Sequence, residues 1–546
     1  MRSPVGIPTG PTDRRARVIT HSAVGQTPCI DPSRAAHVTV VGGGLAGVSA
    51  SLVLAERGVH VTLYEASSVL GGRISSWNDR LNADAGGDLF HMERGFHAFF
   101  RQYYNVRSLL RRIDPTLRFL RPCPDYPLFG PDGAMESFAG LPKTPPLNLL
   151  ALVKRTPTLG LRDLLAIDGD FAAEMLAFDA TTYERFDTMT AADYLDAVKF
   201  PQAARRMLFE VFAHSFFNPQ EDMSAAEMLM MFHLYFCGSA EGILFDVLDQ
   251  PFDDAIWKPL GRLLKASGVD VRLSSALWEV PEPSENEGVV LAVDVKGLRS
   301  IIDSNNWMRA YQPWSDQVVS LKAAPSFAVW RIWFDRDVNP DRSPFAGTAG
   351  LGIIDNISCV HRYQADAQRW ALRTGGSVIE LHGYALPESY ANGTTADETT
   401  VKTELLRALH EVYPEMIGAR IIDERLLVRN DCPSFEPGSW SRRPTVTTGH
   451  RGLKLAGDVV RLPFPTALME RAVSSGFIAA NELLADWGVS PEPVWSIPDR
   501  GLLAGLQAWQ RRRKGLAPRA DLVRPLGILG VVVPQPRGHQ FNKRTY

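Results

Sequence analysis

Several features that define other classes of protein are missing from this 546-residue sequence. Its five cysteines are scattered without a C-x-x-C pair, which argues against a disulfide framework and a cysteine-based zinc site. No apolar run reaches the roughly 18 residues that a transmembrane helix needs. The formal net charge of −3 gives no general attraction for nucleic acid, so we expect no nucleic-acid partner. We predict a cytoplasmic protein with reduced thiols and no bound metal.

The two ends of the chain differ from its middle. Residues 1–36 are rich in Arg, Pro, Ser and Thr and lack the apolar stretch of a secretory signal, which predicts a disordered leader. The remaining chain is too long for one simple core, so we expect two intertwined domains or one domain with large insertions.

Residues 40–73, VVGGGLAGVSASLVLAERGVHVTLYEASSVLGGR, have the order of elements that binds a dinucleotide. Residues 37–41 predict a buried parallel strand, and residues 45–57 predict the helix that follows it. Between them lies a G-x-G-x-x-G motif. Its first glycine allows the tight turn, its second admits a pyrophosphate, and its third lets helix and strand pack closely. The three glycines are Gly42, Gly44 and Gly47.

Two further features narrow the choice of dinucleotide. The N–H groups of the first helical residues, Leu45 and Ala46, and the positive end of the helix dipole favour a phosphate. Glu65 follows a predicted second strand at 59–64 and lies 23 positions after Gly42, where an adenosine ribose needs an acceptor. Because a carboxylate there disfavours a 2′-phosphate, NADP is not expected.

A second glycine pair follows the acid, in Gly71-Gly72-Arg73. A nicotinamide dehydrogenase has no need of this pair. The combination resembles the FAD-binding motif of the flavin amine oxidase and phytoene desaturase superfamily. The resemblance implies a bound FAD, with this segment folded over the pyrophosphate and Arg73 offsetting the phosphate charge.

The C-terminal half agrees with this resemblance. Residues 453–456 predict a buried strand, Gly457-Asp458 follows, and residues 469–484 predict a helix with small residues on one side. In the superfamily the equivalent acid holds the ribityl chain, which implies this role for Asp458. The helix start at Met469 is then directed at the flavin N1/O2 region, where negative charge develops on reduction.

A third segment between these motifs predicts a helix at 257–267 and a strand pair at 269–280. The resemblance implies that Leu277 packs on the adenine, although a plain core strand explains the same residues.

The predicted fold is α/β, with a Rossmann-like FAD-binding domain and an intertwined substrate domain of mixed antiparallel sheet and helices. The division places residues 37–125, 250–300 and 430–485 in the first domain, residues 126–249 and 301–429 in the second, and residues 486–546 in a C-terminal extension. The helical insert is expected to have Thr188 as an N-cap. Residues 326–336 and 376–386 alternate like strands of a half-covered antiparallel sheet.

In the C-terminal extension, apolar residues share one helical face beside a basic cluster at 511–514. Such a helix is typical of an anionic membrane surface, and would place the protein peripherally at the inner face of the membrane. A helix docked on the protein with a solvated basic end explains the same pattern. The apolar residues are Leu502, Leu503, Leu506 and Trp509.

Three classes of function compete. A flavin amine oxidase needs an aromatic cage beside the flavin, but in the approach to Gly457 the only aromatic residue is the distant Trp440. A non-enzymatic prenyl-binding relative of the escort type would have no need of the intact glycines, Glu65, Arg73 and Asp458. A carotenoid desaturase or isomerase fits best, because PTALMERAVSSG resembles the helix start of plant-type carotene desaturases.

Residues 91–129, HMERGFHAFFRQYYNVRSLLRRIDPTLRFLRPCPDYPLF, narrow the class further. They resemble the bacterial carotenoid φ-ring synthases of the isorenieratene synthase type, and the similarity extends over most of residues 37–485. The resemblance implies that β-rings of β-carotene become aromatic φ-rings through hydride loss, a 1,2-methyl shift and proton loss, without a methyl donor. The electron acceptor, a quinone or oxygen, stays open.

The catalytic base is expected in the same segment. Glu93 is the first candidate for proton removal or cation stabilisation, and His97 is the second. An ion pair of Glu93 with Arg94 or Arg101 is the alternative for that carboxylate. Buried neutral histidines are expected at positions 214 and 233, and Glu470 is expected to complement the dipole of its own helix, 469–484.

Overall fold

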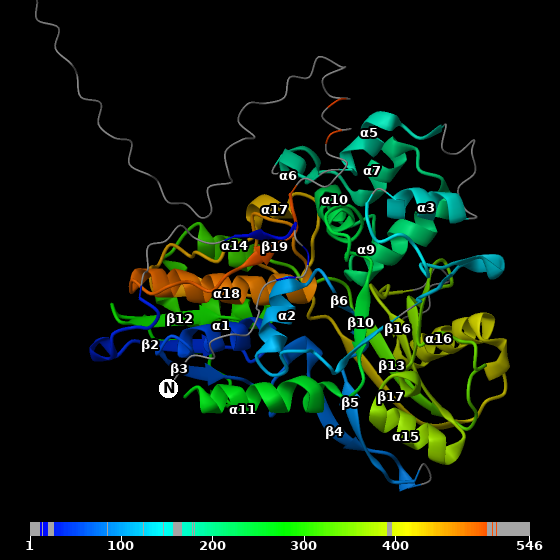
Figure 1. Cartoon of the computed structure of the whole chain (residues 1–546), viewed down its shortest axis with the longest axis horizontal. Helices are drawn as coiled ribbons and strands as arrows, with labels where there is room; N and C mark the ends of the chain where they lie inside the picture. Colours follow the sequence, from blue (N-terminus) through cyan, green and yellow to red (C-terminus); the bar gives the residue numbers. More distant parts are fainter. Residues whose placement is uncertain are drawn as a thin grey trace, which may run out of the picture.

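The computed structural model describes residues 11, 13, 15–19, 27–83, 86–123, 125–145, 147–156, 166–176, 178–179, 181–389, 396–499, 505 and 509. Figure 1 shows two parts side by side: a parallel sheet with its helices, and an antiparallel sheet with a group of helices at one end. Within the described residues, none of the helices is both long and apolar enough to span a bilayer.

A five-stranded sheet forms the first part, and all its strand pairs are parallel. Numbered along the chain, the strands lie in the order 3-2-1-4-5, which is the Rossmann order. The order reverses between β2 and β12, so a crevice opens at the carboxyl ends of these two strands. The strands are β11 (Asp270–Arg272), β3 (His60–Tyr64), β2 (His37–Val41), β12 (Glu287–Leu291) and β18 (Leu453–Leu455).

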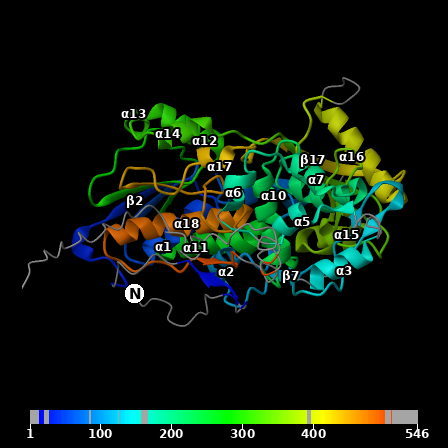
Figure 2. The same ribbon diagram turned by 90° about the horizontal axis from the view of Figure 1, so that it is seen from above.

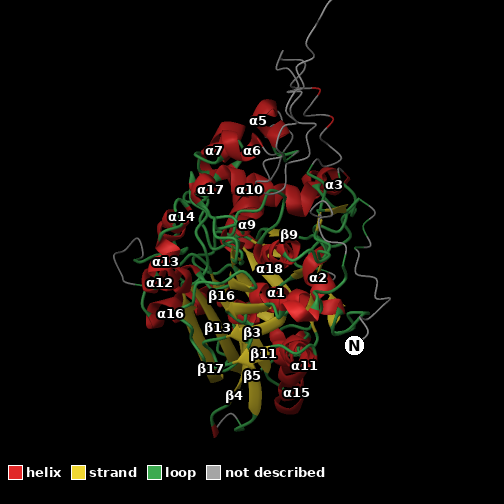
Figure 3. Ribbon diagram, turned by 90° about the vertical axis from the view of Figure 1, so that its left-hand side faces the viewer, coloured by secondary structure: helices red, strands yellow, loops and turns green. Residues whose placement is uncertain are grey.

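Helices cover both faces of the parallel sheet, as Figures 2 and 3 show. On one side α1 and α18 lie against each other, and a Cβ on Gly476 would come 2.2 Å from the Ser49 hydroxyl oxygen. The small residues predicted on this helix therefore allow close helix contact. The helices of the two faces are α1 (Leu45–Ala55), α2 (Tyr104–Arg111), α11 (Lys258–Ala266) and α18 (Leu468–Asp486), with α12 (Val295–Ser304), α13 (Asn306–Arg309) and α14 (Trp314–Ser320) opposite.

The predicted domain boundary at residue 300 falls inside α12. Residues after it stay with the parallel sheet: the Asn305 side chain bonds the backbone of Trp278 and Val280, and the Trp307 indole donates to the Val280 carbonyl. The part of the chain that joins the second sheet therefore begins after α14, later than the predicted boundary.

The second part is a seven-stranded sheet in which only the pair β14–β8 is parallel. Figure 1 places α15 (Ala365–Thr374) and α16 (Glu398–Val412) beside it. In spatial order the strands are β17 (Ile421–Arg429), β13 (Phe327–Phe334), β16 (Ser377–Gly383), β15 (Asn356–Cys359), β14 (Phe345–Thr348), β8 (Leu128–Phe129) and β9 (Met135–Glu136).

The expectation of a half-covered sheet is wrong for the strands β13 and β16. Every residue of β13 and β16 is buried. Alternate residues such as Trp330 and Ile379 pack with α16, whereas Trp333 and Val378 pack with α15 and with the hairpin of β4 (Ser76–Arg80) and β5 (Leu89–Glu93). Both faces are covered because elements from two distant segments add to the sheet.

The helical insert packs over one end of this sheet (Figure 1). The N-cap of α7 is Thr190, whose hydroxyl accepts from the Asp193 N–H at 2.9 Å. The predicted cap, Thr188, is wrong by two residues because Thr190 is the residue in extended conformation before the helix. The helices of the insert are α3 (Leu147–Arg155), α5 (Gly169–Glu174), α6 (Thr181–Phe186), α7 (Ala191–Val198), α8 (Gln202–Arg205), α9 (Val211–Ser215) and α10 (Ala225–Phe232), with π-helical turns at Arg206–Glu210 and His233–Cys237. The short helix α17 (Ser439–Arg442), from a later segment, lies beside them (Figure 1).

The predicted leader and extension carry structure where they are described. Strand β1 (Arg17–Val18) pairs with β19 (Trp495–Ser496), and Ile30 is buried beside the end of α1. The expectation of disorder over 1–36 is therefore wrong for these residues. Composition alone could not show that the apolar side chain of Ile30 is buried against the protein. Of the predicted amphipathic helix, only Gly505 and Trp509 are among the described residues.

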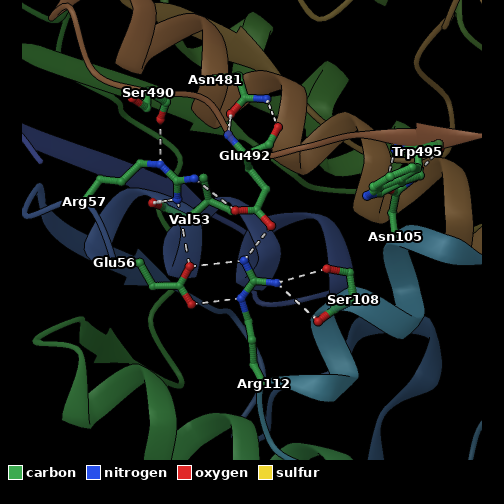
Figure 4. A network of polar contacts seen from close by, with 10 residues as sticks. All are labelled: Val53, Glu56, Arg57, Asn105, Ser108, Arg112, Asn481, Ser490, Glu492 and Trp495. Atoms are coloured by element: carbon green, nitrogen blue, oxygen red, sulfur yellow. Dashed lines mark hydrogen bonds and ion pairs between the residues drawn. The ribbon is translucent and has the colours of Figure 1, made fainter. Parts of the chain in front are cut away.

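A buried network of charges joins residues 486–499 to the first helices (Figure 4). Glu492 accepts from Arg57 at 3.0 Å and from Arg112 at 2.8 Å, and Arg112 also bonds Glu56 at 2.8 Å. Asn481 of α18 bonds the backbone of Glu492 in both directions. Two arginines facing two glutamates leave the network without net charge, which is the arrangement that burial requires.

Candidate active site

A cavity of about 740 Å³ begins at the crevice of the parallel sheet and extends to the antiparallel sheet. Its first end is formed by the residues that follow β2, β3, β12 and β18. All but one of the predicted cofactor residues line it. These are Gly42, Gly44, Leu45, Ala46, Glu65, Gly71, Gly72, Arg73, Leu277, Gly457, Asp458 and Met469.

The exception is Gly47, which packs in the protein interior. A Cβ on Gly47 would lie 1.9 Å from the Gly42 carbonyl oxygen, so this position needs glycine for close approach. Gly44 differs, because a Cβ there would find its nearest protein atom, the Gly72 Cα, at 3.9 Å. Gly44 is also the N-cap of α1 and supplies no side-chain acceptor. The helix start is thus open to a phosphate, as a dinucleotide requires.

Glu65 is held in place by backbone donors. One carboxylate oxygen accepts from the Gly43 N–H at 2.6 Å, and the other accepts from the Ser67 N–H at 2.8 Å. Each oxygen retains a second lone pair for a ribose hydroxyl. This geometry fits the predicted contact with the adenosine ribose.

Arg73 and Asp458 are ion-paired, although the resemblance implied separate roles for them at the pyrophosphate and the ribityl chain. The guanidinium donates two hydrogen bonds to the carboxylate, at 2.7 and 2.5 Å. The turn that carries Arg73 is supported by Trp257, whose indole donates to the Ile74 carbonyl at 2.7 Å. Sequence reasoning missed Trp257, because no motif marks a buried indole as a support for this turn.

Leu277 lines the cavity from a loop, and the predicted strand pair over 269–280 is wrong. Only Asp270–Arg272 is a strand. Ser274 has φ of 51°, and the N–H groups of Ser274 and Ser275 donate to the backbone carbonyls of Ser67 and Glu65. These bonds turn the chain toward the predicted adenine site and end the strand.

The other end of the cavity is aromatic. Phe96 stacks on Phe345 with ring centroids 4.3 Å apart, and Tyr126 stacks on Phe138 at 4.7 Å. The sequence reasoning missed these residues individually, because they come from separate segments. The aromatic lining residues are Phe96, Phe100, Tyr103, Tyr126, Phe138, Phe216, Phe217, Tyr235, Phe245, Phe327, Phe345 and Tyr384.

Glu93 lies behind the cavity wall instead of in it. Its carboxylate accepts from the Phe252 N–H at 2.7 Å and from the Gln364 amide at 2.8 Å, and lies 3.6 Å from Arg331. Burial raises the pKa of Glu93 to about 7. The structure therefore does not support direct proton removal by Glu93.

The expected alternative for Glu93 is also wrong. Arg94 pairs with Asp431, and Arg101 pairs with Asp246, so neither neutralises the Glu93 carboxylate. In both cases an acid distant in sequence lies nearer to the arginine.

His97 lines the cavity as a neutral imidazole. Its Nδ1 lies 2.9 Å from the Gly95 carbonyl oxygen, which makes Nδ1 the protonated nitrogen. Burial lowers the pKa of His97 to about 4. The remaining nitrogen, Nε2, is an acceptor but a weak base.

The other candidates have structural partners. His233 is buried with Nε2 at 2.8 Å from the Pro498 carbonyl, and burial lowers its pKa to about 4, in line with the expected neutral form. His214 differs from the expectation, because Asp355 lies 2.7 Å from its Nδ1 and raises its pKa against burial. Glu470 also differs from the expectation: its carboxyl group accepts from the Asn105 and Val106 N–H groups, so it contacts the start of α2 instead of the start of its own helix.

Within the described residues, one group of side chains lies close enough together to hold a metal ion: His91, Asp253 and Asp254. The Lys258 ammonium lies 2.9 Å from Asp253 and 2.7 Å from Asp254, so it already offsets one of the two carboxylate charges.

Comparison with known proteins agrees with this site. A family model described as flavin containing amine oxidoreductase matches residues 45–484. The chain therefore belongs to the flavin-containing amine oxidoreductases, and its cofactor is FAD. The open start of α1, the fixed Glu65 carboxylate and the cavity along Asp458 and Met469 fit this dinucleotide.

Within this family, the chain is 46% identical over 484 residues to the carotenoid phi-ring synthase of Streptomyces griseus, with 86% of this chain and 92% of that protein covered. It is 25% identical to the carotenoid phi-ring synthase of Chlorobaculum tepidum, covering 85% and 91%. It is 23% identical to a 15-cis-phytoene desaturase of Capsicum annuum, covering 84% and 79%. The structure of putrescine oxidase with bound putrescine is similar in fold, with a TM-score of 0.57 at 15% identity over 82% of this chain and 99% of that one.

Proposed function

We propose that this chain is an FAD-dependent carotenoid φ-ring synthase that converts β-ring end groups of β-carotene to aromatic φ-rings. The observation that carries the proposal is the 46% identity to a carotenoid phi-ring synthase over most of both chains. The aromatic half of the cavity supports it, because a hydrocarbon ring has no polar group for a site to recognise.

Bound FAD supplies the chemistry of hydride acceptance. The protein must hold one ring of the substrate against the flavin and keep water away from the ring cation that hydride loss creates. Faces of aromatic side chains also attract a desolvated cation. Stacked pairs such as Phe96–Phe345 and Tyr126–Phe138 surround this region.

A geminal dimethyl carbon prevents a β-ring from becoming aromatic by hydrogen loss alone. A 1,2-methyl shift to the neighbouring cationic carbon removes this block, and proton loss then forms the double bond. The shift is intramolecular, so a methyl donor is not part of the proposal. The protein groups required are a shaped apolar wall and a base in that wall.

An amine oxidase is the alternative within the same family. The expected cage is not formed by Trp440, which stacks on Tyr183 at 3.6 Å, and neither residue lines the cavity. The second alternative, a prenyl-binding escort-type protein, has no need of the open dinucleotide end.

The proposal also covers the electron acceptor, which we take to be a quinone or oxygen, and the cellular location. A carotenoid dissolves in lipid, so we place the enzyme in the cytoplasm, peripherally at the inner face of the membrane. The exposed Trp509 lies in the segment expected to contact lipid.

Expression in β-carotene-producing bacterial cells, followed by pigment chromatography and mass spectrometry, tests the function. We expect new aromatic carotenoids, with each converted ring four hydrogens lighter than its β-ring. Unchanged β-carotene together with peroxide release from amines would favour the oxidase. Unchanged β-carotene with purified protein that lacks flavin absorbance would favour the binding protein.

A further inference from the structure

Three polar residues at the carboxyl end of β16 project to the same face of the sheet: Glu380, His382 and Tyr384. They are spaced two apart, as side chains on one face of a strand are. Glu380 and His382 are each 1% exposed, and His382 and Tyr384 line the cavity. We call these three residues the β16 relay.

Hydrogen bonds join the β16 relay into a line. The His382 Nε2 lies 2.8 Å from a Glu380 carboxylate oxygen, and the His382 Nδ1 lies 2.7 Å from the Tyr384 hydroxyl. The Asn356 amide donates to the same hydroxyl at 3.0 Å. Because the Asn356 amide already donates to the Tyr384 hydroxyl oxygen, the hydroxyl's own proton is directed at Nδ1 of His382.

The charge of Glu380 sets the tautomer of His382. Arg331 lies opposite Glu380 on β13, with its Nε 2.9 Å from the carboxylate. Burial raises the pKa of Glu380, but Arg331 and then His382 outweigh it and bring that pKa to about 2. Glu380 is therefore ionised and only accepts. The Phe96 N–H also points at Nε2 of His382 from 3.3 Å, but the ionised carboxylate at 2.8 Å is the stronger partner, so Nε2 carries the proton and Nδ1 is free to take another.

The β16 relay differs from the other histidine of the cavity in its hydrogen-bond partners. His97 shares the wall but is bonded only to a backbone carbonyl, with its pKa lowered to about 4. His382 has an ionised carboxylate within hydrogen-bond distance of one ring nitrogen and a hydroxyl within hydrogen-bond distance of the other, which is the arrangement of carboxylate–histidine proton relays. Burial raises the pKa of Tyr384, so its hydroxyl stays protonated until His382 accepts the proton.

We propose that Tyr384 is the catalytic base of ring aromatisation, with His382 as the proton store and Glu380 as the residue that orients it. In this step a C–H bond beside the ring cation breaks, and its electron pair becomes a ring double bond. The proton passes to the Tyr384 oxygen while the tyrosine's own proton moves to Nδ1 of His382. Bound FAD would supply the acceptor for the hydride lost beforehand, so each hydride and proton removed together equal one two-electron oxidation. Two such oxidations remove the four hydrogens that each converted ring loses, and the electron acceptor, a quinone or oxygen, would return FAD to its oxidised form between them. This inference rests on the proposed function.

The test compares FAD-loaded variants in carotene-containing vesicles. Tyr384→Phe keeps the ring and removes the hydroxyl, and we expect product formation to fall about 10²–10⁴-fold, the contribution of a general base. The flavin content and spectrum stay as in the wild type. The matched control is Tyr413→Phe, which removes a buried hydroxyl from the opposite face of the same sheet and keeps the wild-type rate.

Two measurements separate proton relay from structural support. Product formation by the wild type slows in deuterated water, and this solvent isotope effect is absent in Tyr384→Phe. Added imidazole restores activity to His382→Ala, since a free base can occupy the vacated space. Glu380→Gln lowers kcat while KM for the carotenoid stays unchanged.

The outcomes distinguish the two proposals. A wild type that forms no aromatic product contradicts the proposed function and the relay together. Aromatic product from Tyr384→Phe at the wild-type rate contradicts the relay alone. Loss of activity in Tyr384→Phe together with lost flavin also contradicts it, since the hydroxyl would then serve folding.

Discussion

Replacing Gly44 or Gly47 by alanine separates cofactor binding from folding at two positions three residues apart. A Cβ on Gly44 meets no protein atom closer than 3.9 Å, and the backbone there has φ of −78°, which alanine accepts. We expect Gly44→Ala to fold with a free energy of unfolding within about 0.5 kcal/mol of the wild-type apoprotein. The new methyl group occupies the space that the pyrophosphate needs, so FAD affinity falls.

Gly47→Ala is expected to affect folding instead of cofactor binding. Its Cβ would lie 1.9 Å from the Gly42 carbonyl oxygen, so backbone must move by about 1 Å to reach even a tight contact. Overpacking of this kind costs about 1–3 kcal/mol. Alanine recovers about 1 kcal/mol of helix propensity, so the net loss is as much as about 2 kcal/mol.

Thermal unfolding of the apoproteins, with and without added FAD, measures both effects. A ligand at 100 times its Kd stabilises the folded state by about 2.7 kcal/mol. The wild type should gain this stabilisation, Gly44→Ala should lose most of it at unchanged apoprotein stability, and Gly47→Ala should start from lower stability. A Gly44→Ala protein that purifies with a full complement of FAD would refute this assignment of the second glycine.

Three further predictions concern stability and location. Glu492→Gln removes the carboxylate charge that faces the largely buried Arg57 and Arg112 and should cost about 3–5 kcal/mol at neutral pH, measured by denaturant unfolding; unchanged stability would contradict the role of the network. Burial raises the pKa of Glu492, but the arginines hold it below its ordinary value of 4.5, so its contribution is present above pH 4.5 and is lost as pH falls through the folded-state value. The wild-type advantage over Glu492→Gln should therefore shrink in acid. Thr190→Ala should lower the free energy of unfolding by about 1 kcal/mol, whereas Thr188→Ala should change it by less than about 0.5 kcal/mol. Deleting residues 500–546 should reduce sedimentation with anionic liposomes, and equal sedimentation of both proteins would remove the membrane proposal.

The first crevice was predictable because its signals are local. Gly42 to Glu65 form one strand–helix–strand unit, and spacing alone determines what each residue meets. The Arg73–Asp458 pair could not be predicted in this way, since its members are 385 residues apart and meet only through the sheet order.

The substrate end was harder to predict for the same reason. Glu93 looked catalytic because it is an acid in a distinctive segment, but the strand that carries it turns its side chain toward Arg331. The residues of the β16 relay alternate along the chain, so the sequence shows that they share one face of the sheet. It does not show which residues that face contacts. Its neighbours Arg331 and Asn356 became known only with the register of β13 and β15 against β16.

The order of strands in the parallel sheet also governs when the enzyme can acquire its cofactor during synthesis. The strand β18 begins at Leu453, and the acid that follows it completes the wall that begins with Gly42. A nascent chain that lacks these residues has the helix start at Gly44 but not the part of the wall that Gly457 and Asp458 form. We therefore expect cofactor capture to be a late event, which follows translation of more than four-fifths of the chain. Until then the cavity lacks part of the wall that separates it from solvent.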